Sequence, residues 1–205
     1  MSEISTYTGG IAATNAHLLR LPGGTVLVDA PEGATAWLRR QKVRVDVLFL
    51  THQHFDHVMD AAAVKADHGC HVYAFAPFSR ELTLERLFGM VTGTFVEVPA
   101  FEVDELLEGR DTLEAAGETW RLHHVPGHSP DSVCFLLACE HLLFGGDVLF
   151  LDGIGRTDFP GGSTELLLSG IESKLLPLPD ATRVFPGHGD ETTIGRERLE
   201  NPFLN

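Results

Sequence analysis

The sequence contains little cysteine, and its few cysteines are not paired in a motif. Three occur in 205 residues, Cys70, Cys134 and Cys139, and no C-x-x-C pair is present. The odd number and the spacing argue against a disulfide framework. Because Cys134 and Cys139 fall in an apolar stretch, we expect these thiols to be buried and inert.

Positive charge and long apolar runs are also scarce. Fifteen Lys and Arg stand against 29 Asp and Glu, for a net charge of -14. This balance disfavours nucleic acid and anionic membrane surfaces as partners. No stretch approaches the length of a membrane span. The first residues, MSEISTYTGG, lack the basic patch and apolar segment of a secretory signal, so we expect a cytoplasmic protein.

Short apolar runs alternate with turn signals along the chain. A hairpin is expected around Pro22-Gly23-Gly24, and the continuous apolar run 45–50 predicts a strand buried on both faces. Each half begins with strands and continues into helix, which predicts an α/β fold with two sheets face to face and helices outside. We expect one domain over residues 1–205. The predicted helices span residues 32–41, 54–69, 79–90 and 163–179, with a helix or irregular tail over 194–205.

Metal-binding side chains are concentrated directly after the strand that ends at residue 50. The segment THQHFDH holds His52, His54, Asp56 and His57. Loops that follow strands are held rigidly by the sheet while remaining accessible, and functional residues gather there. One metal ion could not easily bind all four groups of so short a segment, whereas two neighbouring ions could share them.

Three later loops each place one further metal-binding residue after an apolar run. His128 follows Pro126-Gly127, Asp147 follows Gly145-Gly146, and His188 lies between Gly187 and Gly189. Neutral imidazoles and carboxylates suit zinc, iron or manganese. A closed structural zinc site is the weaker interpretation, since such sites are rich in cysteine.

The motifs THQHFDH, PGHS, GGD and PGHG, in that order, resemble the metallo-β-lactamase superfamily over nearly the whole chain. The stretches GGDVLFLDGIGRTDFPGGS and FPGHGDETTIGRERLENPFL resemble the glyoxalase II group, the hydroxyacylglutathione hydrolases, and in particular its shorter single-domain members. The resemblance implies a four-layer αβ/βα sandwich with two mixed sheets. It also implies two divalent metal ions per chain, with zinc expected first and iron or manganese as alternatives. The first ion would be held by His52, His54 and His128, the second by Asp56, His57 and His188, and Asp147 would bridge them.

By the same resemblance, the protein is expected to be a thioesterase that cleaves a small-molecule thioester such as S-lactoylglutathione. A hydroxide bridging the two metals would attack the carbonyl, with Asp56 and Asp147 as catalytic residues. Longer glyoxalase II enzymes carry a C-terminal helical extension that binds glutathione, and no such domain is expected here. The alternatives are a persulfide dioxygenase with one iron, and a metal-binding module without turnover. The oligomeric state stays open.

Two further residues are candidates for substrate contact. Arg156, in GRTDFPGG, could form an ion pair with Asp158 within the loop, or could bind a substrate carboxylate through its two-pronged guanidinium group. His17, in the predicted hairpin, could line the mouth of the cleft.

Overall fold

A computed structural model describes residues 2–204, which form two six-stranded sheets and a small two-stranded one. The first sheet contains β1 (Glu3–Gly9), β2 (Thr14–Leu21), β3 (Gly24–Val28), β4 (Val47–Phe49), β5 (His71–Ala74) and β6 (Glu105–Leu106), in that order. β1 to β3 are antiparallel, so the predicted hairpin is present, and β3 to β6 are parallel. The first sheet is therefore mixed.

The second sheet is built from the other half of the chain. Its strands are β7 (Thr112–Ala115), β8 (Glu118–His124), β9 (Val133–Leu137), β10 (Leu142–Gly146), β13 (Arg183–Pro186) and β14 (Thr192–Thr193). Their order is β14-β13-β10-β9-β8-β7, and only the β10–β13 pair is parallel. The small sheet pairs β11 (Leu149–Phe150) with β12 (Gly153–Ile154).

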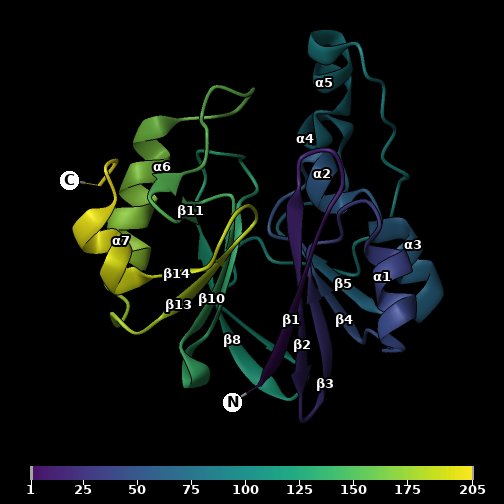
Figure 1. Cartoon of the computed structure of the whole chain (residues 1–205), viewed down its shortest axis with the longest axis horizontal. Helices are drawn as coiled ribbons and strands as arrows, with labels where there is room; N and C mark the ends of the chain where they lie inside the picture. The colour runs from purple at the N-terminus through teal and green to yellow at the C-terminus, as the bar shows by residue number, and fades with distance from the viewer. Residues whose placement is uncertain (1, 205) are drawn as a thin grey trace.

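The two large sheets face each other, and helices cover their outer faces (Figure 1). α1 (Ala34–Gln41) and α3 (Ala61–His68) lie outside the first sheet, and α6 (Thr164–Gly170) and α7 (Ile194–Glu200) lie outside the second. α2 (Phe55–Val58), α4 (Arg80–Thr83) and α5 (Glu85–Thr92) stand at one end of the molecule. This is the predicted four-layer αβ/βα sandwich.

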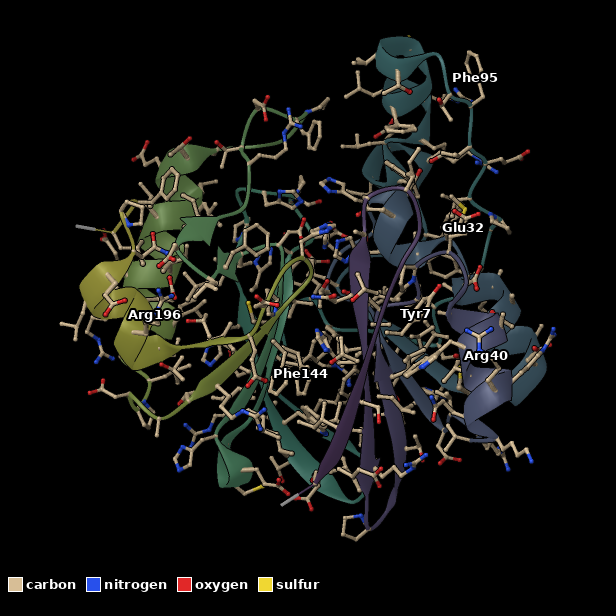
Figure 2. All side chains as sticks on the ribbon, viewed as in Figure 1. Tyr7, Glu32, Arg40, Phe95, Phe144 and Arg196 are labelled. Atoms are coloured by element: carbon tan, nitrogen blue, oxygen red, sulfur yellow. The ribbon has the colours of Figure 1, made fainter. Side chains whose placement is uncertain are left out.

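Aromatic side chains fill the space between the sheets. Phe49 of β4 stacks on Phe135 of β9, with ring centroids 4.4 Å apart, and meets Trp120 of β8 edge-on at 5.0 Å. Phe144 also lies between the sheets (Figure 2). On the opposite face of β4, Leu48 belongs to a second buried cluster that joins the sheet to its helices. β4 is therefore buried on both faces, as its apolar sequence predicted.

The predicted helices over 54–69 and 79–90 are each interrupted. The first separates into α2 and α3, because the amide of Asp60 donates to the carbonyl of Ala30 at 2.8 Å and its carboxylate accepts from the amide of Thr35 at 2.9 Å. These bonds tie the chain to the loop after β3 instead of continuing the helix. The second breaks at Leu84, whose φ of 56° is left-handed, between α4 and α5. The predicted helix over 163–179 is α-helical only to Gly170, and the wider π-type turn Ile171–Leu175 follows it.

The predicted burial is confirmed for Cys134 and is wrong for Cys139. Cys70 and Cys134 are buried, and burial raises the pKa of Cys70 to about 11 and that of Cys134 to about 12. Cys139 is exposed, because it lies in the short 3-10 turn Ala138–Glu140 that links β9 to β10. Within residues 2–204, none of the helices combines the length and the apolar character needed to cross a bilayer.

Candidate metal centre

Three histidines from both sheets form a first group at one edge of the sandwich. His52 and His54 follow β4, and His128 follows β8. One ligand nitrogen from each lies within 4.8 Å of the other two, and all three side chains are buried. Nε2 of His52 and Nδ1 of His54 are 3.1 Å apart. The structure thus brings together the three residues expected to hold the first metal.

A second group is formed by Asp56, His57 and His188, whose ligand atoms also lie within 4.8 Å of one another. Asp56 and His57 belong to α2, and His188 follows β13. Nε2 of His188 is 3.3 Å from the Asp56 carboxylate, and Nε2 of His57 is 3.5 Å from it. This group is the one expected to hold the second metal.

Asp147, at the end of β10, lies between the two groups. Its Oδ2 is 3.4 Å from Nε2 of His128 and 3.3 Å from Nε2 of His188, and its Oδ1 is 3.3 Å from Nε2 of His57. It therefore contacts a histidine of the first group and two of the second. A carboxylate in this position can provide one oxygen to each of two neighbouring cations, as expected for a bridging ligand.

Hydrogen bonds behind the groups orient the imidazoles. Nδ1 of His57 donates to Asp29 at 2.8 Å, and Nδ1 of His128 donates to the carbonyl of Arg156 at 2.8 Å. The Thr51 hydroxyl donates its proton to Asp29 at 2.7 Å and can therefore accept from Nδ1 of His52 at 3.2 Å. These bonds occupy Nδ1 of all three imidazoles, so Nε2 is the nitrogen that faces the inside of the site, as is typical of metal-binding histidines.

Sequence reasoning missed Asp29 and Thr51. Asp29 follows β3 at the end of TVLVDA, has a left-handed φ of 58°, and is buried. An aspartate at the end of a buried strand, in the same position as Asp147 after β10, was a signal that could have indicated it. The Thr14 hydroxyl, which donates to Asp56 at 2.7 Å, was also not foreseen.

The charges of the site differ between the two groups. Burial lowers the pKa of His52 well below its usual value and that of His54 to about 3, so both are neutral at pH 7. Burial opposes ionisation of Asp147, but His57 and His188 outweigh it and hold the pKa of that carboxyl well below its usual range. Burial likewise opposes the charge on His188, whose contacts with Asp147 and Asp56 raise its pKa to about 10. The carboxylates are ionised, as cation binding requires.

The close packing of the site requires a glycine before His188. A β-carbon on Gly187 would lie 2.2 Å from Oδ1 of Asp147 and 2.5 Å from Cε1 of His57. Both neighbours are held in place, so any side chain at this position would displace a group of the site.

The buried atoms of the site fit a metal. Nε2 of His57, Nε2 of His128 and Oδ1 of Asp147 are buried and have no hydrogen-bond partner in the described part of the chain. Burying a polar atom without a hydrogen-bond partner costs free energy, so protein interiors normally provide a partner for each such atom. Here several converge on one small volume as imidazole nitrogens and carboxylate oxygens, which is the donor set of a divalent transition metal. The residues present therefore fit metal binding.

A cavity of about 740 Å³ opens above the groups. Its floor contains His54, Asp56, His128, Asp147 and His188. One wall comes from Leu84 and α5, and the other from β11, β12 and the loop that follows them. The size lies within the range of small-molecule sites.

The two expected substrate contacts have different outcomes. Arg156 lines the cavity and forms an ion pair with Asp158, in which Nε and Nη2 donate to the two carboxylate oxygens at 2.7 and 2.6 Å. His17 is buried between Phe144 and Phe185, and its Nε2 is 3.0 Å from the carbonyl of Pro186. It is absent from the lining of the cavity, so its expected place at the mouth of the cleft is wrong. The reason is that this position of β2 points into the space between the sheets.

Comparison with known families identifies the fold. The family model of the metallo-beta-lactamase superfamily matches residues 9–188. The chain belongs to this superfamily. The match covers all seven expected ligands, and metal binding is thus supported both by the family and by the side chains that the fold brings together.

Individual members of the superfamily are similar over most of the chain. The hydroxyacylglutathione hydrolase GloC of Haemophilus influenzae is 40% identical over 171 residues, which cover 80% of this chain and 77% of GloC. The crystal structure of the BLEG-1 B3 metallo-beta-lactamase has a TM-score of 0.87 at 36% identity and covers 98% of this chain and 99% of its own. The structure of TTHA1623 in a di-iron-bound form has a TM-score of 0.84 at 34% identity and covers 98% and 100%.

Proposed function

We propose that this metallo-hydrolase cleaves thioesters, in the manner of the glyoxalase II group, and that it does so with two divalent metal ions. His52, His54 and His128 would hold the first ion, Asp56, His57 and His188 the second, and Asp147 both. The observation that carries the proposal is the convergence of these ligand atoms beneath an open cavity, where Nε2 of His57, Nε2 of His128 and Oδ1 of Asp147 are buried without a hydrogen-bond partner. The similarity to GloC supports the choice of a thioester.

Such a pair of cations lowers the pKa of bound water towards about 7 and polarises a carbonyl. The net reaction adds water across the C–S bond: the acyl carbon gains oxygen, and the thiol leaves with one of the protons of water. The residues of the chain have to hold the charges in place during this exchange. Asp29 and Thr51 fix the imidazoles of His57 and His52, and the Thr14 hydroxyl fixes the carboxylate of Asp56.

Phe159 shields the first group from water. Its ring meets His54 edge-on with centroids 5.5 Å apart and lies 6.3 Å from His128. Exclusion of water strengthens the electrostatic interactions inside the site. The substrate would therefore approach from the side of the cavity, above Asp56 and Asp147.

Both metal-binding groups are complete, which favours hydrolysis over the alternative of a persulfide dioxygenase with one iron. The similarity to BLEG-1 makes the amide bond of a β-lactam a second candidate for the bond cleaved. Zinc is the proposed metal, and the similarity to TTHA1623, solved in a di-iron-bound form, makes iron the first alternative.

The test combines elemental analysis with three assays on one purified preparation. Thiol release from a thioester panel, hydrolysis of a chromogenic cephalosporin, and oxygen consumption with glutathione persulfide are measured at known metal content. We expect about two metals per chain and thiol release that stops after chelation and returns with metal. One iron per chain with oxygen consumption would instead establish the dioxygenase. A fully loaded protein that is inactive in all three assays would indicate a metal-binding module.

A further inference from the structure

One wall of the cavity is an apolar stripe formed by the short helix α5 and by Leu84, which precedes it. Leu84, Leu87, Phe88 and Val91 all line the cavity. Leu87 and Phe88 lie four and three residues before Val91, which places these three on one face of α5, and Leu84 lies directly before the helix. In a helix of this type the apolar face normally packs against the core, but here it lines the cavity above the metal groups.

The opposite wall is apolar as well. Phe150 of β11, Ile154 of β12 and Phe159 of the following loop line it. Phe55 lies at the base, where its ring contacts that of Phe88 with centroids 4.6 Å apart. A ligand that reaches the floor of the cavity therefore passes between two apolar surfaces.

The cavity offers no unpaired cation in the part of the chain that the structure describes. Arg156 is the one Lys or Arg of the lining, and Nε and Nη2 of its guanidinium group already donate to Asp158. The guanidinium carbon also lies 4.1 Å from the centroid of the Phe159 ring. A substrate carboxylate that took over the guanidinium would leave Asp158 unpaired beside it. Since exposed ion pairs contribute little free energy, replacing Asp158 by the substrate carboxylate would add almost nothing to substrate binding.

The apolar surface extends beyond the cavity. Val91, at the outer end of the stripe, is 77% exposed, and its neighbour Met90 is 74% exposed. Exposed apolar groups that continue a cavity are typical of a ligand-binding surface. The length of the stripe indicates a ligand that begins at the floor and runs along α5 past Val91.

We propose that the substrate carries an uncharged, apolar acyl chain that lies along the stripe formed by Leu84 and α5. This inference rests on the proposed thioesterase function and names its substrate class: apolar acyl thioesters, in preference to the short, polar and anionic S-lactoylglutathione. The carbonyl lies over the metal groups, and the chain extends between Phe88 and Val91 on one side and Phe150 on the other.

The test is a series of acyl thioesters of N-acetylcysteamine, an uncharged thiol, from acetyl to hexanoyl, with S-lactoylglutathione alongside. Complete burial of one methylene corresponds to about a fourfold gain. Because the cavity is open on one side, we expect about twofold per methylene in kcat/KM, or roughly 16-fold from acetyl to hexanoyl. S-Lactoylglutathione should be a poorer substrate than the hexanoyl thioester.

Val91→Ser and the isosteric Val91→Thr probe the outer end of the stripe, with Leu199→Ser as a matched control. Leu199 of α7 is 78% exposed and lies on the other side of the molecule, outside the cavity lining. We expect both Val91 variants to reduce the ratio of kcat/KM for the hexanoyl thioester to kcat/KM for the acetyl thioester by about threefold. Leu199→Ser should leave this ratio unchanged. Binding of the matching 2-oxoalkyl thioethers, which cannot be hydrolysed, is measured by calorimetry with the metal-loaded protein.

Each outcome of this design decides the proposal. If kcat/KM does not change with acyl chain length and S-lactoylglutathione is cleaved efficiently, the apolar substrate class is overturned and the thioesterase function stands. Thioethers that bind more tightly with chain length, without cleavage of any thioester, support the apolar ligand and remove the thioesterase function. If Val91→Ser instead converts a dimer to a monomer and leaves the ratio unchanged, the stripe is a contact between two copies of the chain and the proposal is wrong.

Discussion

Replacing Asp29 by Asn would test how the protein prepares His57 for metal binding. The carboxylate of Asp29 is buried and accepts three hydrogen bonds: from the amide and the hydroxyl of Thr51 at 2.8 and 2.7 Å, and from Nδ1 of His57 at 2.8 Å. With the amide oxygen of Asn bound to the Thr51 amide, its NH2 group faces Nδ1–H of His57. The imidazole can relieve this clash of donors by moving its proton to Nε2, and Nε2 is the nitrogen that faces Asp147.

The expected magnitude follows from that change of tautomer. Loss of a hydrogen-bonding partner behind a metal-binding histidine weakens metal affinity by about 10- to 100-fold, which corresponds to about 1.4–2.7 kcal/mol. Hydrogen bonds to a charged group contribute about 1.5–3 kcal/mol each to stability. We therefore expect Asp29→Asn to lower the free energy of unfolding of the metal-free protein by about 2 kcal/mol and to weaken metal binding further.

Competition with a chromophoric chelator measures the affinity, urea unfolding measures the stability, and two-dimensional 1H–15N NMR reports the tautomer of His57. Asp46→Asn is the matched control, because Asp46 accepts a hydrogen bond from the amide of Thr25 at the far end of β3 and is partly exposed. A folded Asp29→Asn protein that keeps its metal affinity within twofold would refute the reasoning.

Four further predictions concern other parts of the site. Asp147→Ala should abolish hydrolysis and lower the metal content measured by elemental analysis, and unchanged activity would contradict a bridging role. Gly187→Ala should reduce metal affinity at least about tenfold, since the new methyl group overlaps Asp147 and His57; a crystal structure or chelator competition would show whether the site moves. Burial raises the pKa of Asp131 to about 6, above its usual 3.8. The folded state therefore binds this proton more tightly than the unfolded state. Relative to Asp131→Asn, the wild type should gain stability as the pH falls from about 7 to 4, by up to about 3 kcal/mol in urea unfolding. A stability difference that is constant with pH would exclude the effect. Arg156→Ala should change the KM for an uncharged thioester less than twofold, because its guanidinium group is paired with Asp158, and a large rise in KM would restore it as a substrate contact.

The fold and the ligand positions followed from short motifs because each motif combines a local and a chemical signal. An apolar run fixes a buried strand, and a histidine or aspartate directly after it is held at the sheet edge. This applies to His52 after β4, Asp147 after β10 and His188 after β13. The ligand set itself came from the family resemblance, since spacing alone does not reveal which loops meet.

The remaining features depend on contacts that are distant in sequence. The interruption between α2 and α3 arises from bonds between Asp60 and the loop after β3, which no helical periodicity reveals. His17 faces the interior because of the register of β2 with β1 and β3. The ion pair between Arg156 and Asp158 depends on loop geometry that a single sequence does not reveal. The same holds for the contact between Asp29 and His57.

The origin of the ligands in both sheets has a consequence for how the protein is made. His188 is translated 131 residues after His57, the last of the four ligands in the first half of the chain. A nascent chain therefore cannot complete the second group until His188 has been synthesised. Metal bound to both groups would link the first and second halves of the chain. Its stabilisation of the folded state would grow with the logarithm of the free metal concentration.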